Sequence, residues 1–245
     1  MKRNYYMLLI VFIMSLSVHN ASAQFVVALD TIRGRIDFCT RPGDLTTMQL
    51  VSNDSVFYMY PPDREIDPWR YVGYYLPSRE VKSGYIRGTD LMRIDDYEMI
   101  EVSRLSSQGI ISFEGNDVRV NISVSGVTSK DTFLQKGTDG LYRVKGRIVK
   151  GIARGDSPRL RYQSISVSIK GRTVVFPKGV YDYLLEPEID NMAVYYNSEK
   201  GIVYLLANNG GTKAYYNVLW QVTAKGVGSP YIFDPSLRVS QFIKR

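Results

Sequence analysis

The chain has 245 residues, 44% of them hydrophobic, and a formal net charge of +7. It contains one cysteine, Cys39, and one histidine, His19, which excludes an internal disulfide framework and leaves a single imidazole for Ser-His, Cys-His or His-metal chemistry. The basic residues are spread along the sequence, which argues against nucleic-acid binding, although their excess weakly favours an anionic partner.

Residues 1–23 have the three parts of a secretion signal. Lys2 and Arg3 give the positive start, Met7 to Met14 is an unbroken apolar run, and Ala21-Ser22-Ala23 is a small-residue cleavage site. The apolar run is shorter than the ~18–20 residues that a membrane-spanning helix needs. We therefore expect a mature chain that begins at Gln24 and is exported to the periplasm or the extracellular space without stable membrane insertion.

Removal of this segment would also remove His19. The mature chain would hold 29 basic and 24 acidic residues, a net charge of +5, and no histidine. This favours a non-catalytic protein, and we assign no catalytic residue, metal site or cofactor. Without a histidine to activate its thiol, Cys39 is expected to be a small buried side chain.

Residues 24–104 are predicted to form the first of two β domains. They contain, in order, Arg41-Pro42-Gly43, Trp69-Arg70-Tyr71-Val72, Gly84-Tyr85-Ile86 and Leu91. Over residues 27–95 this order resembles a bacterial SH3 domain. The resemblance implies a small SH3-like barrel, with Trp69 and Val72 packed inward and Gly84 at a tight strand entry.

The same resemblance implies ligand contacts at an aromatic loop. The residues concerned are Tyr58, Tyr60, Trp69, Tyr74 and Tyr75. The alternative is that these rings fill the core or pair across strands. Asp63, Glu65 and Asp67 lie beside Trp69, and carboxylates beside an aromatic groove suit either glycan hydrolysis or glycan binding.

Residues 104–115, which are rich in Ser and Gly, are predicted to separate this domain from a second antiparallel β domain at 115–245, a sandwich or a barrel. Apolar and polar residues alternate from Val118 to Val124 and from Ile165 to Ile169, as in strands with one buried face. Val180 to Leu185 is expected to form a single turn, and no long helix is predicted. The chain is thus expected to be all-β.

A strong hairpin pattern lies near the end of the chain. Ile202 to Ala207 is predicted to pair with Ala214 to Val222 through the turn Asn208-Asn209-Gly210-Gly211. The returning strand would bury Tyr216, Val218, Trp220 and Val222. The Gly-Gly turn and the strand Tyr215–Trp220 are similar to those of small secreted β domains, periplasmic lysozyme inhibitors among them.

Three charged segments of the second half suggest binding. Arg143, Lys145 and Arg147 alternate with other residues and would form a basic stripe on one strand face, able to hold an acidic glycan or protein, or simply a solvated face. Arg154-Gly155-Asp156 matches an integrin-binding tripeptide, but an ordinary exposed turn is expected there. The acidic residues Glu186, Glu188 and Asp190 offer oxygens to Ca²⁺, yet a solvated turn is expected.

These observations favour an exported, non-catalytic binding protein of the bacterial envelope. The expected partner is peptidoglycan or another envelope protein, and the sequence leaves the oligomeric state open. One alternative is an inhibitor or immunity-type protein that blocks a wall-degrading enzyme. A second alternative is a glycan hydrolase that uses two carboxylates, and a third is host adhesion through Arg154 to Asp156.

Overall fold

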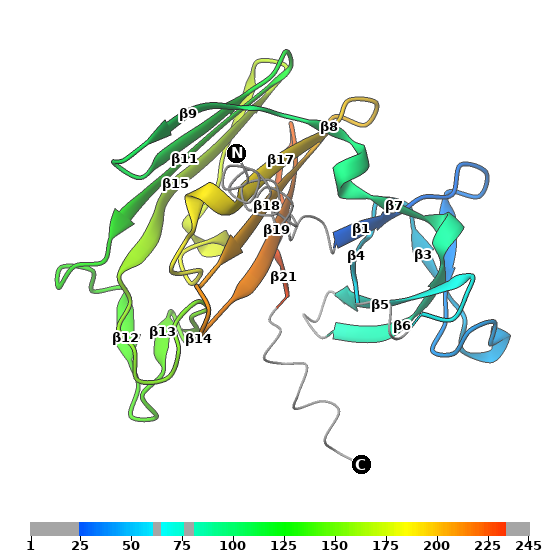
Figure 1. The fold of residues 1–245 in the computed structure, drawn as a ribbon, viewed down its shortest axis with the longest axis horizontal. Helices are drawn as coiled ribbons and strands as arrows, with labels where there is room; N and C mark the ends of the chain where they lie inside the picture. The colour runs from blue at the N-terminus through cyan, green and yellow to red at the C-terminus, as the bar shows by residue number, and fades with distance from the viewer. Residues whose placement is uncertain (1–24, 61–64, 76–80, 234–245) are drawn as a thin grey trace, which may run out of the picture.

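A computed structural model describes residues 25–60, 65–75 and 81–233 (Figure 1). The chain is all-β, as predicted, and is built from antiparallel sheets. Within these ranges the helical segments are 3-10 turns of three residues each: η1 (Leu45–Thr47), η3 (Gly88–Asp90), η4 (Ile94–Asp96), η5 (Lys178–Val180) and η6 (Ile189–Asn191). None of the described helices is long and apolar enough to span a membrane.

The first unit is a five-stranded sheet in the order β6-β5-β4-β1-β7 with a two-stranded hairpin folded over it. The sheet strands are β1 (Phe25–Ala28), β4 (Val56–Met59), β5 (Trp69–Tyr75), β6 (Val81–Arg87) and β7 (Leu91–Arg93). The hairpin strands are β2 (Arg35–Phe38) and β3 (Gln49–Ser52). Apolar side chains fill the space between sheet and hairpin, among them Ile36, Phe38, Phe57 and Val72.

Gly84 allows the hairpin to approach the sheet closely. The backbone of Cys39, directly after β2, exchanges two hydrogen bonds with Tyr85 of β6, at 3.1 and 2.7 Å. A Cβ atom at Gly84 would lie 2.5 Å from the Cys39 carbonyl oxygen and 2.6 Å from the Phe38 ring. Gly84 therefore lies in the middle of β6 rather than at a strand entry, and it is the close approach of the hairpin that requires glycine there. Cys39 is buried, as expected, and burial raises the pKa of its thiol.

Two larger sheets make up the second unit. The first has the order β16-β15-β11-β10-β9, with β9 (Val102–Ser106), β10 (Ile110–Glu114), β11 (Val118–Gly126), β15 (Leu160–Ile169) and β16 (Arg172–Val175). The second has the order β20-β19-β18-β17-β8, with β8 (Glu98–Met99), β17 (Met192–Asn197), β18 (Ile202–Asn209), β19 (Tyr216–Thr223) and β20 (Gly226–Val227), and β21 (Tyr231–Phe233) also pairs with β19. A small separate sheet contains β12 (Leu134–Lys136), β13 (Tyr142–Val144) and β14 (Arg147–Ile148).

The alternating patterns are confirmed as the core between these two sheets. Val118, Val120 and Ile122 are buried on β11, and Ile165, Val167 and Ile169 are buried on β15. From the opposite sheet, β19 contributes Tyr216, Val218, Trp220 and Val222. Trp220 meets the Tyr162 ring edge to face at 5.8 Å, and its indole nitrogen donates to the Val180 carbonyl at 3.2 Å.

The segment predicted to separate the two halves belongs to the second unit. β9 and β10 form a hairpin, and β10 pairs with β11 along five residues. β8 already pairs with β17. The first unit therefore ends near Tyr97, and the Ser and Gly residues of 104–115 mark a hairpin rather than a linker.

The second large sheet is covered on both faces, so the fold has three layers (Figure 1). One face packs on the β9–β16 sheet. The other face packs on the first unit, where Tyr58 and Ile94 meet Tyr204 and Leu219. β18 is consequently apolar at six successive positions, as expected for a strand buried on both sides. The two units share one continuous interface.

Candidate functional site

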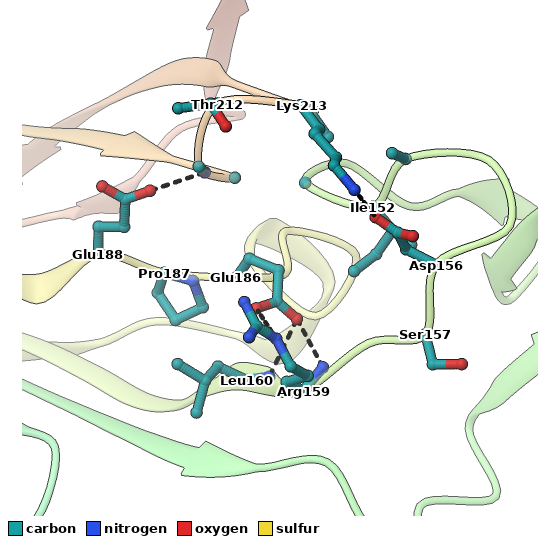
Figure 2. Close-up of a pocket in the computed structure, with 15 residues that line it drawn as sticks. Ile152, Asp156, Ser157, Arg159, Leu160, Glu186, Pro187, Glu188, Thr212 and Lys213 are labelled. Atoms are coloured by element: carbon teal, nitrogen blue, oxygen red, sulfur yellow. Dashed lines mark hydrogen bonds and ion pairs between the residues drawn. The ribbon is translucent and has the colours of Figure 1, made fainter.

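A groove of about 580 Å³ opens at one end of the sandwich (Figure 2). Its walls come from three segments: 151–160, between β14 and β15; 186–188; and the β18–β19 turn at 210–214. The segments are far apart in sequence but adjacent in the fold. The groove therefore unites the Arg154–Pro158 turn, the acidic turn and the Gly-Gly turn that sequence analysis treated separately.

Two glycines form a closely packed floor. Gly151 has φ +89° and Gly210 has φ +88°, a region of backbone conformation that favours glycine. A Cβ atom at Gly151 would collide with the Leu185 carbonyl, and one at Gly210 would collide with the Ala214 carbonyl. The backbones of the three segments can meet only because these positions lack side chains.

Glu186 fastens the second segment to the first. Its own φ is +52°, an uncommon conformation for a residue with a side chain. Its carboxylate accepts the backbone N–H groups of Arg159, at 2.5 Å, and of Leu160, at 3.2 Å. The Arg159 guanidinium lies 3.5 Å from the same carboxylate. The Glu186 carbonyl also accepts the backbone N–H of Gly210 at 3.0 Å, so the strained backbone is held from both sides of the groove.

Glu188 fastens the second segment to the third. Its carboxylate accepts the backbone N–H of Gly211 at 2.7 Å, and its backbone N–H donates to the Asn209 side chain at 3.1 Å. Asn209 is fully buried and also bonds the hydroxyl of Tyr162. Burial raises the pKa of Tyr162, so this hydroxyl stays protonated and serves as a fixed hydrogen-bonding group.

Both signs of charge stand at the rim. Lys213 is 77% exposed and lies 3.9 Å from Asp156, and Figure 2 shows the two side chains pointing toward one another. The Arg159 side chain is 84% exposed beside Glu186. An exposed pair such as Lys213–Asp156 contributes little to stability, and the Arg159 guanidinium is itself exposed, so these charges can be redirected to a ligand at small cost. The groove is suited to bind a polar ligand that carries both positive and negative groups.

The aromatic residues proposed for the first unit do not form a common surface. Tyr60 is only 7% exposed and packs in the interface beside Phe233. Tyr74 is half-buried, with its ring centroid 4.9 Å from that of Phe57. Trp69 is half-buried rather than fully inward, and the Arg87 guanidinium lies 5.4 Å from its ring centroid. The side chain of Tyr75 lies outside the described residues.

The prediction that Arg143, Lys145 and Arg147 form a basic stripe on one strand face is wrong. The strand ends at Val144, and Lys145-Gly146 forms a two-residue hairpin turn in which both residues have positive φ. Val144 pairs with Arg147 across this turn, so Arg143 and Arg147 lie on opposite faces. The two guanidiniums have separate partners: Arg143 pairs with Asp139 at 2.6 Å, and Arg147 lies 3.4 Å from the centroid of the Tyr183 ring.

Four of the acidic residues singled out in the sequence are engaged by a guanidinium or by backbone amides. Of the group near Trp69, Asp63 lies outside the described residues, while Glu65 and Asp67 lie 3.4 and 3.7 Å from the Arg70 guanidinium. Glu186 and Glu188 turn to different backbone amides, as described above. Among the described residues, no group of three His, Cys, Asp or Glu side chains is placed to hold a metal ion.

Comparison with known proteins identifies no relative of this chain. No protein-family model matches the chain, and neither curated proteins nor solved structures provide a match. Sequence analysis missed Arg159 and Lys213 as site residues because each is a single charge next to a turn. The closest signal was the Gly-Gly turn at Gly210-Gly211, which marks where backbones approach one another.

Proposed function

We propose that this protein is an exported, non-catalytic binding protein of the bacterial envelope. In this proposal residues 1–23 direct export, the first unit is an SH3-like module, and the groove of the second unit binds the ligand. The first unit supports the SH3-like assignment through its short antiparallel strands, its inserted hairpin and the glycine at Gly84.

The observation that carries the proposal is the mixed charge of the groove. Arg159 and Lys213 present cations to the groove. Asp156 presents a carboxylate 3.9 Å from the Lys213 ammonium group. The peptide chains of peptidoglycan carry free carboxylates and free amino groups, which complement such a surface. A peptide-bearing wall fragment is therefore the ligand that we propose for the groove.

The carboxylates in the groove support binding over hydrolysis. Glu186 and Glu188 each accept backbone N–H groups that hold the three segments together. A hydrolase needs one carboxyl group to donate a proton and a second to act as base or nucleophile. In this groove the same groups fix the backbone, as the walls of a binding site require.

Co-sedimentation with insoluble peptidoglycan tests the proposal. The chain from Gln24 to Arg245 is expected to pellet with the polymer, and Arg159→Gln/Lys213→Gln is expected to weaken pelleting at least about tenfold. A matched control, Arg104→Gln/Lys130→Gln, removes the same charge from two exposed residues outside the groove. Equal loss in both variants would indicate non-specific attraction, and absence of pelleting would contradict wall binding and favour the alternative, a wall-degrading enzyme as partner.

A further inference from the structure

A second pocket, of about 430 Å³, lies where three hairpin turns of the sandwich meet. Lys170 lies in the β15–β16 turn, Lys200 in the β17–β18 turn and Lys225 in the β19–β20 turn. The groove described above adjoins the other ends of β15 and β18. Strand β18 has eight residues and rises about 3.3 Å per residue, so the two sites are roughly 25 Å apart.

The wall of this pocket carries four cations and no carboxylate. The cationic residues are Lys170, Arg172, Lys200 and Lys225. Lys200 pairs with Asp54 at 2.7 Å and Lys170 lies 3.9 Å from Asp117, while Arg172 and Lys225 have no ion pair with a described residue. Like charges held close together repel one another, and a bound anion would relieve that repulsion.

Turn geometry fixes the backbone positions of two of these cationic residues. Ile169 pairs with Arg172 directly across a two-residue turn, in which Lys170 has φ +48° and Gly171 has φ +79°. This is the tight hairpin turn whose twist matches that of its strands. The exposed Ala224 adds apolar surface to the same pocket. The cations thus line the same pocket as an apolar surface, which suits the C–H face of a sugar ring.

We propose that this pocket binds a phosphorylated sugar. Arg172 and Lys225 would hold the phosphate oxygens, since guanidinium and ammonium groups are strong donors to phosphate. Lys170 and Lys200 would add to the positive field. The inference is independent of the ligand proposed for the groove, because the two pockets have no lining residue in common.

Calorimetric titration of the chain from Gln24 to Arg245 tests the proposal. Glucose 1,6-bisphosphate is expected to bind at low salt, inorganic phosphate to bind at least about tenfold more weakly, and glucose not to bind. Raising the salt concentration should weaken the interaction, because screening acts on exposed charges. Arg172→Gln/Lys225→Gln should weaken binding at least about tenfold, while Arg104→Gln/Lys130→Gln should leave it within about twofold.

Three results would overturn the proposal: no binding of the bisphosphate, equal binding by the pocket variant, or equal affinity for inorganic phosphate. Phosphatidylcholine vesicles with and without lipid A distinguish the sources of the ligand. Co-sedimentation with the vesicles that contain lipid A, in addition to binding of the bisphosphate, would support a lipid-linked sugar phosphate, whereas binding of the soluble bisphosphate without co-sedimentation would support a free or polymeric one. Because Arg159 and Lys213 remain unchanged in the pocket variant, its peptidoglycan pelleting tests the groove separately.

Discussion

The Tyr97 ring at the end of the first unit stacks on the Tyr204 ring of β18, with centroids 5.4 Å apart and an interplanar angle of 14°. Around this pair, Lys200 donates to both carboxylate oxygens of Asp54 at 2.7 and 2.9 Å, and the Gln221 side chain donates to the Asp54 carbonyl at 3.3 Å. The interface between the units is therefore both apolar and specifically hydrogen-bonded. We expect the two units to unfold together.

Leu219→Ala should weaken both units because Leu219 is fully buried in their shared interface. The expected loss is about 2–5 kcal/mol in the free energy of unfolding, measured by urea denaturation. Leu45→Ala is the control: its side chain is 77% exposed, so its effect should stay within about 0.5 kcal/mol.

Two natural probes report the units separately. Trp220 fluorescence, in a Trp69→Phe background, follows the second unit, and reaction of the Cys39 thiol follows the first. Burial and the raised pKa of Cys39 should make that thiol unreactive until the first unit opens. Coincident transitions are expected, and two transitions at different urea concentrations would show that the units unfold independently.

Gly84→Ala should destabilise the first unit by about 1–3 kcal/mol. The added methyl group would press on the Cys39 carbonyl, and backbone cannot move aside as a flexible side chain can. Gly179→Ala is the matched control, since no atom lies within 4 Å of the added carbon and its φ is not positive. Urea denaturation compares the two variants, and equal stability would contradict the close packing of hairpin on sheet.

Tyr162→Phe should cost about 1–3 kcal/mol, because it removes the hydroxyl that satisfies the buried Asn209 amide. The comparison is Tyr142→Phe, whose ring is only half-buried and whose hydroxyl makes no hydrogen bond with a described residue. Differential scanning calorimetry should place the melting temperature of Tyr162→Phe below that of both Tyr142→Phe and the parent. Equal melting temperatures would show that Asn209 does not depend on this hydroxyl.

Acid should weaken the fold partly through Asp139. Hydrogen bonds from the Arg143 guanidinium, and then from the Leu141 amide, hold the pKa of Asp139 well below its ordinary value of 3.8. The unfolded chain then binds this proton more readily, so the contribution is present above pH 3.8 and is lost as pH falls through the folded pKa. Asp139→Asn should therefore lose less stability on acidification than the exposed-residue control Asp190→Asn, as measured by urea midpoints at pH 6 and pH 3.

The regular strands were predictable from sequence because a single buried face imposes a period of two. Val118 to Val124 and Ile165 to Ile169 show this directly. The continuous apolar run Ile202 to Ala207 carried a further signal, burial on both faces, which indicates a third layer. Sequence analysis treated it only as half of a hairpin.

Other features depended on tertiary context. The charges of Arg143, Lys145 and Arg147 alternate like a strand, but Lys145-Gly146 is a tight turn, and that local preference prevails. The groove could not be predicted, because Arg159, Glu186 and Lys213 come together only through strand pairings distant in sequence. Tyr60 looked like a ligand contact, yet the second unit covers it.

We propose that the groove binds a peptide-bearing wall fragment. The most direct measurement is a titration of the ¹⁵N-labelled chain from Gln24 to Arg245 with soluble muropeptides, followed by amide chemical shifts. We predict that the largest shifts occur at the amides of Gly210, Gly211 and Lys213. Shifts confined to the surroundings of Trp69, or no shifts at saturating muropeptide, would contradict the assignment of ligand binding to the groove.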